Sequence, residues 1–255
     1  MLGACAPPDQ VLYAVGDVHG RADLNGALLE ALVRDAEGCS ESLRTIVYLG
    51  DYVDRGPSSR QVVDQLLELG RSSNLQTVTL RGNHDAQLLA FLDDPTEGAT
   101  FARYGGLETL RSYGAWPGTS WPETRDALRS ALPPGHLAFF QQLRSSFVCG
   151  DYFFAHAGAR PGVRLDVQSD EDLMLIRGDF LSASEPFEKV VVHGHTPELD
   201  ATFDGRRLGL DTGAYATGKL TAVRLRGQER DVFCAAATGR GGIDILVRPL
   251  ALNST

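Results

Sequence analysis

Residues 45–57 read TIVYLGDYVDRGP, an apolar run that passes directly into a glycine-bounded turn carrying two aspartates and an arginine. The apolar run is typical of a buried strand, and the turn begins where that strand would end. Aspartate and glycine are ordinary turn residues, so an isolated turn of this composition has a plain structural explanation. A functional interpretation needs partners from elsewhere in the chain.

Two other stretches repeat this arrangement. VLYAVGDVHG at 11–20 precedes a helical pattern over 21–35, and LQTVTLRGNHD at 75–85 precedes a helical pattern that runs through Leu88 and Leu92. The central stretch leads into a helix that we expect to begin at Pro57 and to end at Gly70. Three strand–loop–helix units in series predict an α/β domain with parallel strands.

The chain changes character after the third unit. Residues 95–145 contain both tryptophans, several glycines and prolines, and three helical patches, so we interpret them as a helical insert or cap. Beyond the insert, the pattern predicts two strands joined by a turn at 150–151, a helix over 169–181 and a strand-rich region over 188–250. We therefore expect a single domain over residues 1–255 with the insert inside it.

Composition limits the classes of function. The chain has 255 residues, of which 43% are hydrophobic and 22% charged, as in an ordinary globular protein with a sizeable core. A formal net charge of −9 without a long basic run disfavours nucleic acid or an anionic membrane as a partner. No apolar stretch approaches the roughly 18 residues of a membrane span.

Two further features point to a reducing compartment. The four cysteines lie far apart and form no Cys-x-x-Cys pair, so neither a zinc knuckle nor a disulfide framework is predicted. The first residues, MLGAC, end like a lipoprotein cleavage box, but no basic segment and apolar stretch precede it. We expect a structureless start and a cytoplasmic protein.

The histidines gather at one kind of position. The sequence has six histidines, and all but His136 lie where a predicted strand gives way to a loop, namely His19, His84, His156, His193 and His195. We expect His136, which follows turn residues in the insert, to be exposed. The carboxyl ends of strands in an open α/β sheet are where ligands bind. The first three units also place Asp17, Asp51, Asp54, Arg55 and Asn83 along that edge.

The donor types indicate a metal site. Carboxylate oxygens, imidazoles and an amide oxygen suit manganese, iron, zinc or magnesium, and thiolates are absent from the set. The number of ligands exceeds what one metal with an open position needs. The count therefore favours two metals that share a carboxylate.

Five blocks in this order resemble the PPP-type serine/threonine phosphatases within the calcineurin-like metallophosphoesterases, most closely their bacterial and phage branch. The blocks are GDVHG, GDYVDRG, GNHD, HAGARPG and GHTP, joined by YGGLETLRSYG in the insert and DTGAYATGKLTAV near the end. The resemblance extends from about Val11 to Val223 and implies an α/β/β/α sandwich. Two departures concern fine specificity, namely Asp85 where many relatives carry glutamate, and Leu175 at a position that is often aromatic.

The resemblance implies a role for each matching residue. Asp17 and His19 would bind a first metal, Asp51 would bridge, and the second metal would be completed by Asn83, His156 and His195. His84 would be the general acid with Asp54 as its partner, and Arg55 and Arg177 would bind phosphate oxygens. His193 is interpreted as a supporting or rim residue. Arg81 and Tyr215 are weaker candidates for substrate contact, for which a structural role has at least equal weight.

The implied reaction is hydrolysis of a phosphomonoester, with a phosphoprotein or a small phosphoester as substrate. Two divalent ions bring four positive charges and Asp17 and Asp51 return two negative ones, so an acidic protein would hold a positive pocket. A hydroxide bridging the metals would attack phosphorus, and His84 would protonate the leaving oxygen. Mn²⁺ is the preferred ion, with iron, zinc or magnesium as alternatives.

Two alternatives remain open. Symmetrical diadenosine tetraphosphatases resemble all these blocks, but they typically show alanine, in GDLVARG, where this chain has Asp54. A non-enzymatic descendant that only binds metal is the second alternative, although every expected ligand and the acid are present. A P-loop kinase or ATPase is excluded, because no Gly-x-x-x-x-Gly-Lys-Ser/Thr motif occurs.

Overall fold

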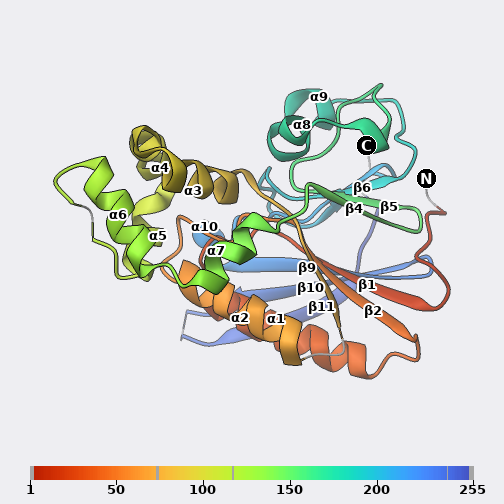
Figure 1. The fold of residues 1–255 in the computed structure, drawn as a ribbon. Helices are drawn as coiled ribbons and strands as arrows, with labels where there is room; N and C mark the ends of the chain where they lie inside the picture. The colour runs from red at the N-terminus through yellow and green to blue at the C-terminus, as the bar shows by residue number, and fades with distance from the viewer. Residues whose placement is uncertain (1–2, 73–74, 117, 240, 253–255) are drawn as a thin grey trace.

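The computed structural model describes residues 3–72, 75–116, 118–239 and 241–252, and its two β-sheets pack face to face (Figure 1). The first sheet has the order β11-β10-β9-β1-β2-β3. Its strands are β1 (Gln10–Val15), β2 (Leu43–Tyr48), β3 (Gln76–Thr79), β9 (Lys219–Arg226), β10 (Glu229–Ala237) and β11 (Ile243–Pro249). The predicted parallel pairing of β1, β2 and β3 is confirmed, whereas β9, β10 and β11 add antiparallel strands.

The second sheet has the order β4-β5-β6-β8-β7. Its strands are β4 (Ser146–Cys149), β5 (Tyr152–Ala155), β6 (Val190–His193), β7 (Thr202–Phe203) and β8 (Arg207–Gly209). The predicted hairpin around residues 150–151 joins β4 and β5 in antiparallel register. β5, β6 and β8 run parallel, so their carboxyl ends lie at one edge of the sheet.

The strand sequences explain the layering. In β1 every residue is buried, because alternate side chains enter two different cores. Val11, Tyr13 and Val15 pack under α1 (Ala22–Glu37) and α2 (Ser59–Ser72), whereas Leu12 and Ala14 pack between the sheets. A third core lies on the outer face of the second sheet, beneath α8 (Asp170–Leu175) and α9 (Gly178–Leu181). The predicted α/β/β/α sandwich is confirmed.

The region 95–145 is helical, as the sequence predicts, and forms the lobe at the left of Figure 1 together with α3. After α3 (Asn83–Asp93) come a 3₁₀ turn η1 (Pro95–Glu97), α4 (Gly98–Phe101), a π-helical turn η2 (Ala102–Gly106), α5 (Leu107–Ser112), α6 (Trp121–Ala131) and α7 (Pro134–Gln141). Two more short helical turns, η3 (Leu165–Val167) and α10 (Ala214–Thr217), lie in later loops. That residues 1–255 form a single domain stays a prediction.

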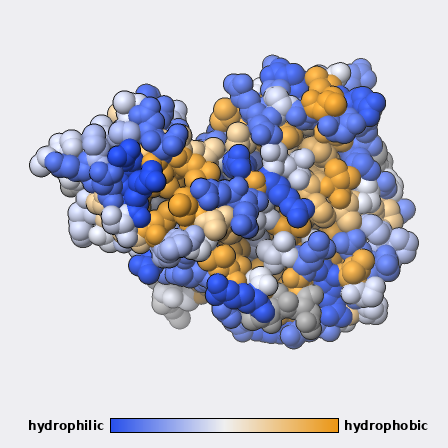
Figure 2. All heavy atoms as spheres, viewed as in Figure 1, coloured by the Kyte–Doolittle hydropathy of each residue, from blue (hydrophilic) through white to orange (hydrophobic). Residues whose placement is uncertain are grey.

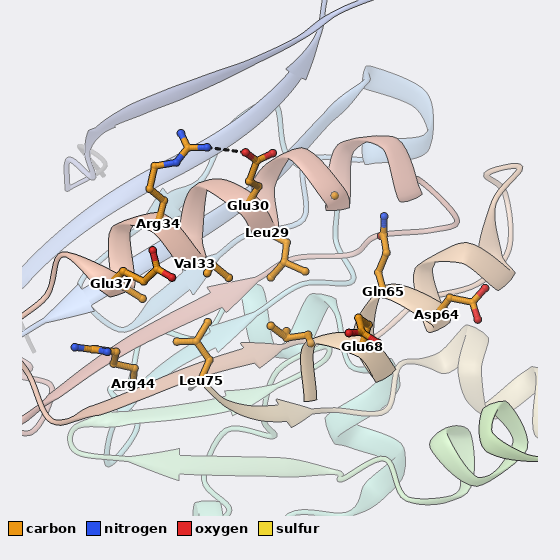
Figure 3. A pocket seen from close by; sticks show the side chains of 13 residues that line it. Leu29, Glu30, Val33, Arg34, Glu37, Arg44, Asp64, Gln65, Glu68 and Leu75 are labelled. Atoms are coloured by element: carbon orange, nitrogen blue, oxygen red, sulfur yellow. Dashed lines mark hydrogen bonds and ion pairs between the residues drawn. The ribbon is translucent and has the colours of Figure 1, made fainter. Parts of the chain in front are cut away.

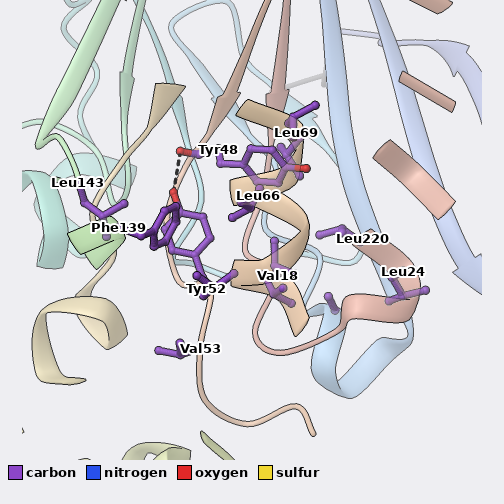
Figure 4. Packing of buried hydrophobic residues seen from close by; sticks show 14 of the residues in the cluster. Val18, Leu24, Tyr48, Tyr52, Val53, Leu66, Leu69, Phe139, Leu143 and Leu220 are labelled. Carbon is purple, nitrogen blue, oxygen red and sulfur yellow. Dashed lines mark hydrogen bonds between the residues drawn. The ribbon is translucent and has the colours of Figure 1, made fainter. Parts of the chain in front are cut away.

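Aromatic side chains attach this lobe to the core beneath α2 (Figure 4). Tyr52 is fully buried, donates its hydroxyl hydrogen to the Leu80 carbonyl at 2.8 Å, and packs edge-on against Phe139 of α7 with ring centroids 5.2 Å apart. The GDYVDRG turn is therefore anchored through its own tyrosine to both β3 and α7.

Three local expectations are wrong. The helix over 169–181 is broken between α8 and α9, because Arg177 has φ −136° and ψ −91°. His136 is buried, since its ring nitrogens contact the Tyr113 hydroxyl at 2.9 Å and the Asp64 carboxylate at 3.0 Å. The start of the chain is ordered from residue 3 onward, with Ala4 and Ala6 buried against the core between the sheets. Met1 and Leu2 lie outside the described residues.

Candidate metal centre

Apart from Arg177, which lies between α8 and α9, the predicted site residues lie at the carboxyl ends of β1, β2, β3, β5 and β6. Several of them hold backbone conformations that side chains disfavour. Among the residues that the structure describes, the non-glycine residues with positive φ are His19 (43°), Asp51 (54°), Asp54 (70°), Arg55 (67°) and His195 (63°). All of these belong to the predicted site, and strained backbone of this kind collects where the surrounding structure imposes a functional geometry.

Asp85 fixes the turn that carries Asp51. Its buried carboxylate accepts three backbone N–H groups, from Asp51 at 2.8 Å, from Tyr52 at 3.1 Å and from Gly82 at 2.9 Å. These bonds join the loop after β2 to the loop after β3. From the sequence, Asp85 was expected to affect only fine specificity, whereas its contacts make it a positioning residue for the site.

Two groups of possible metal ligands share Asp51. His19, Asp51 and His84 form one group, and Asp51, His156 and His195 form the other. Within each group the ligand atoms lie within 4.8 Å of one another. One carboxylate common to two groups is what a dinuclear centre requires.

His19 and His156 are oriented to present one nitrogen each to Asp51. The Nδ1 atom of His19 lies 2.9 Å from the Val53 carbonyl, and the Nδ1 atom of His156 lies 3.0 Å from the Leu49 carbonyl. Each Nδ1–H is therefore the donor, and each Nε2 keeps a lone pair. Burial lowers the pKa of His19 to about 3 and also lowers the pKa of His156, which favours the neutral rings that bind metals.

The acceptor atoms in the centre fit a cation. The Asp51 Oδ2 atom lies 3.4 Å from Nε2 of His19 and 3.5 Å from Nε2 of His156. The Asn83 Oδ1 atom lies 3.1 Å from that same His156 nitrogen. Because the Nδ1 contacts place the ring hydrogens on Nδ1, the Nε2 lone pairs of both histidines face the lone pairs of the Asp51 and Asn83 oxygens. Divalent ions between these atoms would supply the positive charge that such an arrangement needs.

Asp17 adds a further buried carboxylate to the centre. It accepts the His195 backbone N–H at 3.0 Å, while burial and the nearby charges of Asp211 and Asp51 raise its pKa. Asp211 is also buried, and burial is the main cause that raises its pKa to about 6. Asp211 was not predicted as a site residue, although its place just after β8, at the same sheet edge, was a usable signal. Carboxylates this crowded are stabilised by bound cations.

Two glycines in the motifs are required by close approach to these carboxylates. A Cβ atom on Gly82 would collide with the Asp51 side chain, and one on Gly194 would collide with the Asp17 side chain. Glycine therefore lets the backbone approach the metal ligands here.

His84 belongs to the first group by distance, but we do not count it as a ligand, because both of its nitrogens have partners within the protein. Its Nδ1 atom bonds the Asp54 Oδ2 atom at 2.8 Å, and its Nε2 atom lies 3.1 Å from the Arg55 guanidinium. Asp54 is fully buried, and the Asp51 and Asp54 carboxylates raise the pKa of His84 despite the opposing effect of burial. This contact is what an acid and its partner would need, and the catalytic roles of His84 and Asp54 stay a prediction.

The two predicted phosphate-binding arginines face the centre, and the described residues offer neither of them a carboxylate partner. Arg55 lies over the Tyr215 ring, with its guanidinium carbon 4.7 Å from the ring centroid. Arg177 donates from Nε to the His195 Nε2 atom at 3.0 Å. The break between α8 and α9 is what turns Arg177 toward the centre.

Arg81, a weaker candidate for substrate contact, and His193, interpreted as a supporting or rim residue, both have partners outside the centre. Arg81 donates to the Leu143 carbonyl at 3.3 Å, a contact with the chain just after α7. His193 belongs to β6, and its ring packs edge-on against Phe180 with centroids 4.9 Å apart. Both contacts fit structural roles.

A cavity of about 680 Å³ opens beside the centre, between the insert and α8. It is lined by Asn83, His84, Ala86, Gln87, Ala90, Thr100, Tyr104, Met174, Leu175, Arg177 and His195. Figure 2 shows the notch between these two lobes, with hydrophobic residues at its margin. Its described lining contains no carboxylate, so an extended anion could lie along it.

A second cavity, of about 760 Å³, lies between α1 and α2 (Figure 3). Its walls include Leu29, Val33 and the ion pair of Arg34 with Glu30. The described lining contains none of the predicted site residues. Size alone therefore does not identify the reactive site, which is identified by its ligand chemistry.

Comparison with known proteins gives a family match over most of the chain. The model of the calcineurin-like phosphoesterase family matches residues 11–228. The asymmetrical bis(5'-nucleosyl)-tetraphosphatase PrpE of Anoxybacillus flavithermus is 24% identical over 197 residues, which cover 71% of this chain and 75% of the relative. The symmetrical bis(5'-nucleosyl)-tetraphosphatase of Acidovorax ebreus is 32% identical over 158 residues, which cover 59% of this chain and 44% of the relative.

The crystal structure of a putative diadenosine tetraphosphatase has the same fold. It superimposes with a TM-score of 0.57 at 21% identity, covering 97% of this chain and 99% of that one. In the part of the chain that the structure describes, we find no helix long and apolar enough to cross a membrane.

Proposed function

Because this chain belongs to the calcineurin-like phosphoesterase family, we propose that its metal-dependent hydrolysis acts on dinucleoside polyphosphates such as diadenosine tetraphosphate. Relatives that match most of the chain carry this activity in their names, and those are of the asymmetrical type. The proposed reaction is therefore attack by water on the polyphosphate chain to give a nucleoside triphosphate and a nucleoside monophosphate. The substrate class is that of the diadenosine tetraphosphatases, the alternative left open from the sequence. The proposed cleavage is asymmetrical, whereas that alternative was the symmetrical enzyme.

The observation that carries this proposal is the cavity of about 680 Å³ beside the metal centre. Its lining includes His84 and Arg177 as well as the half-exposed ring of Tyr104 and the side chain of Leu175. A polyphosphate needs cationic partners near the reacting phosphorus, and a base needs an aromatic or apolar surface. The cavity supplies both without an opposing carboxylate in its described lining.

The chain's own residues divide the chemical work. Two divalent ions, held by Asp17, His19, Asp51, Asn83, His156 and His195, would supply an activated water and neutralise phosphate charge when bound. Mn²⁺ is the ion we propose, since oxygen and imidazole donors suit it. Arg55 and Arg177 would hold the equatorial oxygens, and His84 would protonate the oxygen that leaves.

A second candidate is a phosphoserine or phosphothreonine protein phosphatase. It is favoured by one observation, the buried bond of 2.8 Å between Asp54 and His84. An alkoxide is a poor leaving group and needs a strong proton donor, whereas a departing phosphate needs little help. A chain with this pair has the proton donor that hydrolysis of phosphate monoesters needs.

A substrate panel distinguishes the two candidates. The purified Mn²⁺-loaded protein would be assayed on diadenosine tetraphosphate, a phosphoserine peptide and p-nitrophenyl phosphate, with the Asp51→Asn variant as a blank for contaminating phosphatases. Chromatography of the nucleotide products separates ATP plus AMP from two molecules of ADP. We expect the highest kcat/KM on diadenosine tetraphosphate, with ATP and AMP as products. A higher kcat/KM on the phosphopeptide would select the second candidate, and two molecules of ADP would select symmetrical cleavage.

A further inference from the structure

One side chain of the helical insert contacts the predicted acid pair of His84 and Asp54. Thr109 of α5 is fully buried and donates its hydroxyl hydrogen to the Asp54 Oδ1 atom at 2.6 Å. The Asp54 backbone N–H donates back to the same hydroxyl oxygen at 2.9 Å. Ser59, at the start of α2, lies 3.2 Å from the Thr109 hydroxyl. Thr109 is 55 residues from Asp54 and 50 residues from Ser59 in the sequence, whereas Ser59 is a near neighbour of Asp54 and also accepts the Asp54 backbone N–H at 3.2 Å.

The hydrogen count fixes the direction of every bond. Thr109 has one hydroxyl hydrogen, which goes to Asp54 because an ionised carboxylate only accepts. The hydrogen between Ser59 and Thr109 then comes from Ser59. Asp54 receives Thr109 on Oδ1 and the Nδ1–H of His84 on Oδ2, at 2.8 Å. The result is a one-way chain of donors, from Ser59 through Thr109 to a carboxylate that also holds His84.

The insert also supports the strained turn that carries Asp54 and Arg55. Both residues have left-handed backbone conformations, with φ of 70° and 67°. The Arg55 N–H donates to the Gly105 carbonyl of the insert at 3.1 Å. Gly105 has φ 102°, and a Cβ atom there would lie 2.8 Å from the Arg55 nitrogen. Two insert residues therefore hold neighbouring residues of the turn: Thr109 bonds Asp54 through its side chain, and Gly105 bonds Arg55 through its backbone.

We propose that Thr109 is a positioning residue for acid catalysis, so that the insert supplies a third member of the His84–Asp54 pair. Thr109 touches neither of the two ligand groups, so its effect reaches the reaction only through Asp54. The proposal rests on the role of His84 as the acid in the proposed function. Without the hydroxyl, the Oδ1 atom of Asp54 would be buried without a side-chain donor, and the carboxylate would hold the imidazole less firmly.

The test compares two leaving groups. Thr109→Val keeps the shape of the side chain and removes the hydroxyl. We expect it to lower kcat on phenyl phosphate, which has a poor leaving group, by roughly tenfold or more, and kcat on p-nitrophenyl phosphate by less than about threefold. Thr109→Ser should restore the wild-type ratio. Thr124→Val is the matched control, because Thr124 is a buried insert threonine whose hydroxyl bonds the Ser120 carbonyl at 2.9 Å.

A double-mutant comparison separates failure of this inference from failure of the acid role. Thr109→Val combined with Asp54→Asn should be no slower on phenyl phosphate than Asp54→Asn alone, because both changes act through one imidazole. If His84→Ala and Asp54→Asn show no preference between the substrates, the acid role itself is wrong. If they show it and Thr109→Val resembles Thr124→Val, the proposal for Thr109 is overturned. Should Thr109→Val not fold, Thr109→Ser and Thr109→Ala give the same comparison, and equal leaving-group ratios for those two variants overturn it.

Discussion

Asp85→Asn removes one charge and one acceptor from the residue that joins the loops after β2 and β3. The amide oxygen of asparagine can occupy either carboxylate position. At the Oδ2 position it keeps two partners, the N–H groups of Asp51 and Gly82. Its NH₂ group then faces the Tyr52 N–H, which now bonds Oδ1 at 3.1 Å.

The contacts set the size of the effect. One buried N–H loses its acceptor, which costs about 1–3 kcal/mol. Two charge-assisted bonds become neutral ones, at about 1 kcal/mol each. We expect a loss of about 3–5 kcal/mol in the free energy of unfolding of the Mn²⁺-loaded protein. Because Asp51 shifts with its loop, Mn²⁺ affinity should also fall by roughly 10–100-fold.

The assay is denaturant unfolding with and without Mn²⁺, together with calorimetric titration of Mn²⁺. In the chelated protein the loss should be smaller, because removing the Asp85 charge also relieves its repulsion with Asp51. Asp93→Asn is the matched control, since Asp93 belongs to the same helix and is exposed. Equal stability and equal Mn²⁺ affinity for the two variants would refute the role assigned to Asp85.

The remaining predictions concern other parts of the structure. Arg177→Ala should lower kcat/KM by more than about tenfold with unchanged stability, and values of kcat and KM that both stay within about twofold of wild type would make Arg177 a bystander. Gly194→Ala should abolish binding of the first metal ion by displacing the Asp17 side chain, and a metal content equal to that of the wild type would contradict the steric argument. Gly70→Ala, which meets open space in a helix, should raise stability by about 0.5–1 kcal/mol. Burial lowers the pKa of His136, so its protonation opposes folding, and the stability of the wild-type protein should decrease as pH falls below about 6.5. Urea unfolding of His136→Gln should show a weaker decrease, and identical slopes would mean that His136 does not titrate on unfolding.

Much of the architecture was predictable from periodicity. Apolar runs that end at glycine and are followed by polar loops predicted the three parallel units. The composition of residues 95–145 predicted a helical insert. β9, β10 and β11 were expected only as a strand-rich region, and the pairing of β9 with β1, which lies far away in the sequence, leaves no local pattern. The break at Arg177 was missed because α8 and α9 together satisfy the helical period, and only tertiary contacts with His195 turn the backbone there.

The part of the site made of typical metal-ligand residues was predictable from the sequence. Residues that only orient those ligands or the acid were not predictable, because their residue types have no specific association with metal sites. His19, Asp51 and His156 were found because imidazoles and carboxylates at strand ends suggest ligands. Asp85 and Thr109 were not, because an aspartate inside a helix and a threonine in an insert have many uses. Their roles appear only once the fold brings them against Asp51 and Asp54.

Metal counting tests the central claim that Asp51 is shared by two ions. The measurement is the number of Mn²⁺ ions bound per chain, determined by elemental analysis after dialysis and by calorimetric titration, for the wild-type protein, His156→Ala and Asp51→Asn. We predict two ions for the wild type, one for His156→Ala, and a loss of affinity for both ions in Asp51→Asn. A wild-type protein that binds a single ion, or an Asp51→Asn variant that keeps two with unchanged affinity, would contradict the dinuclear centre.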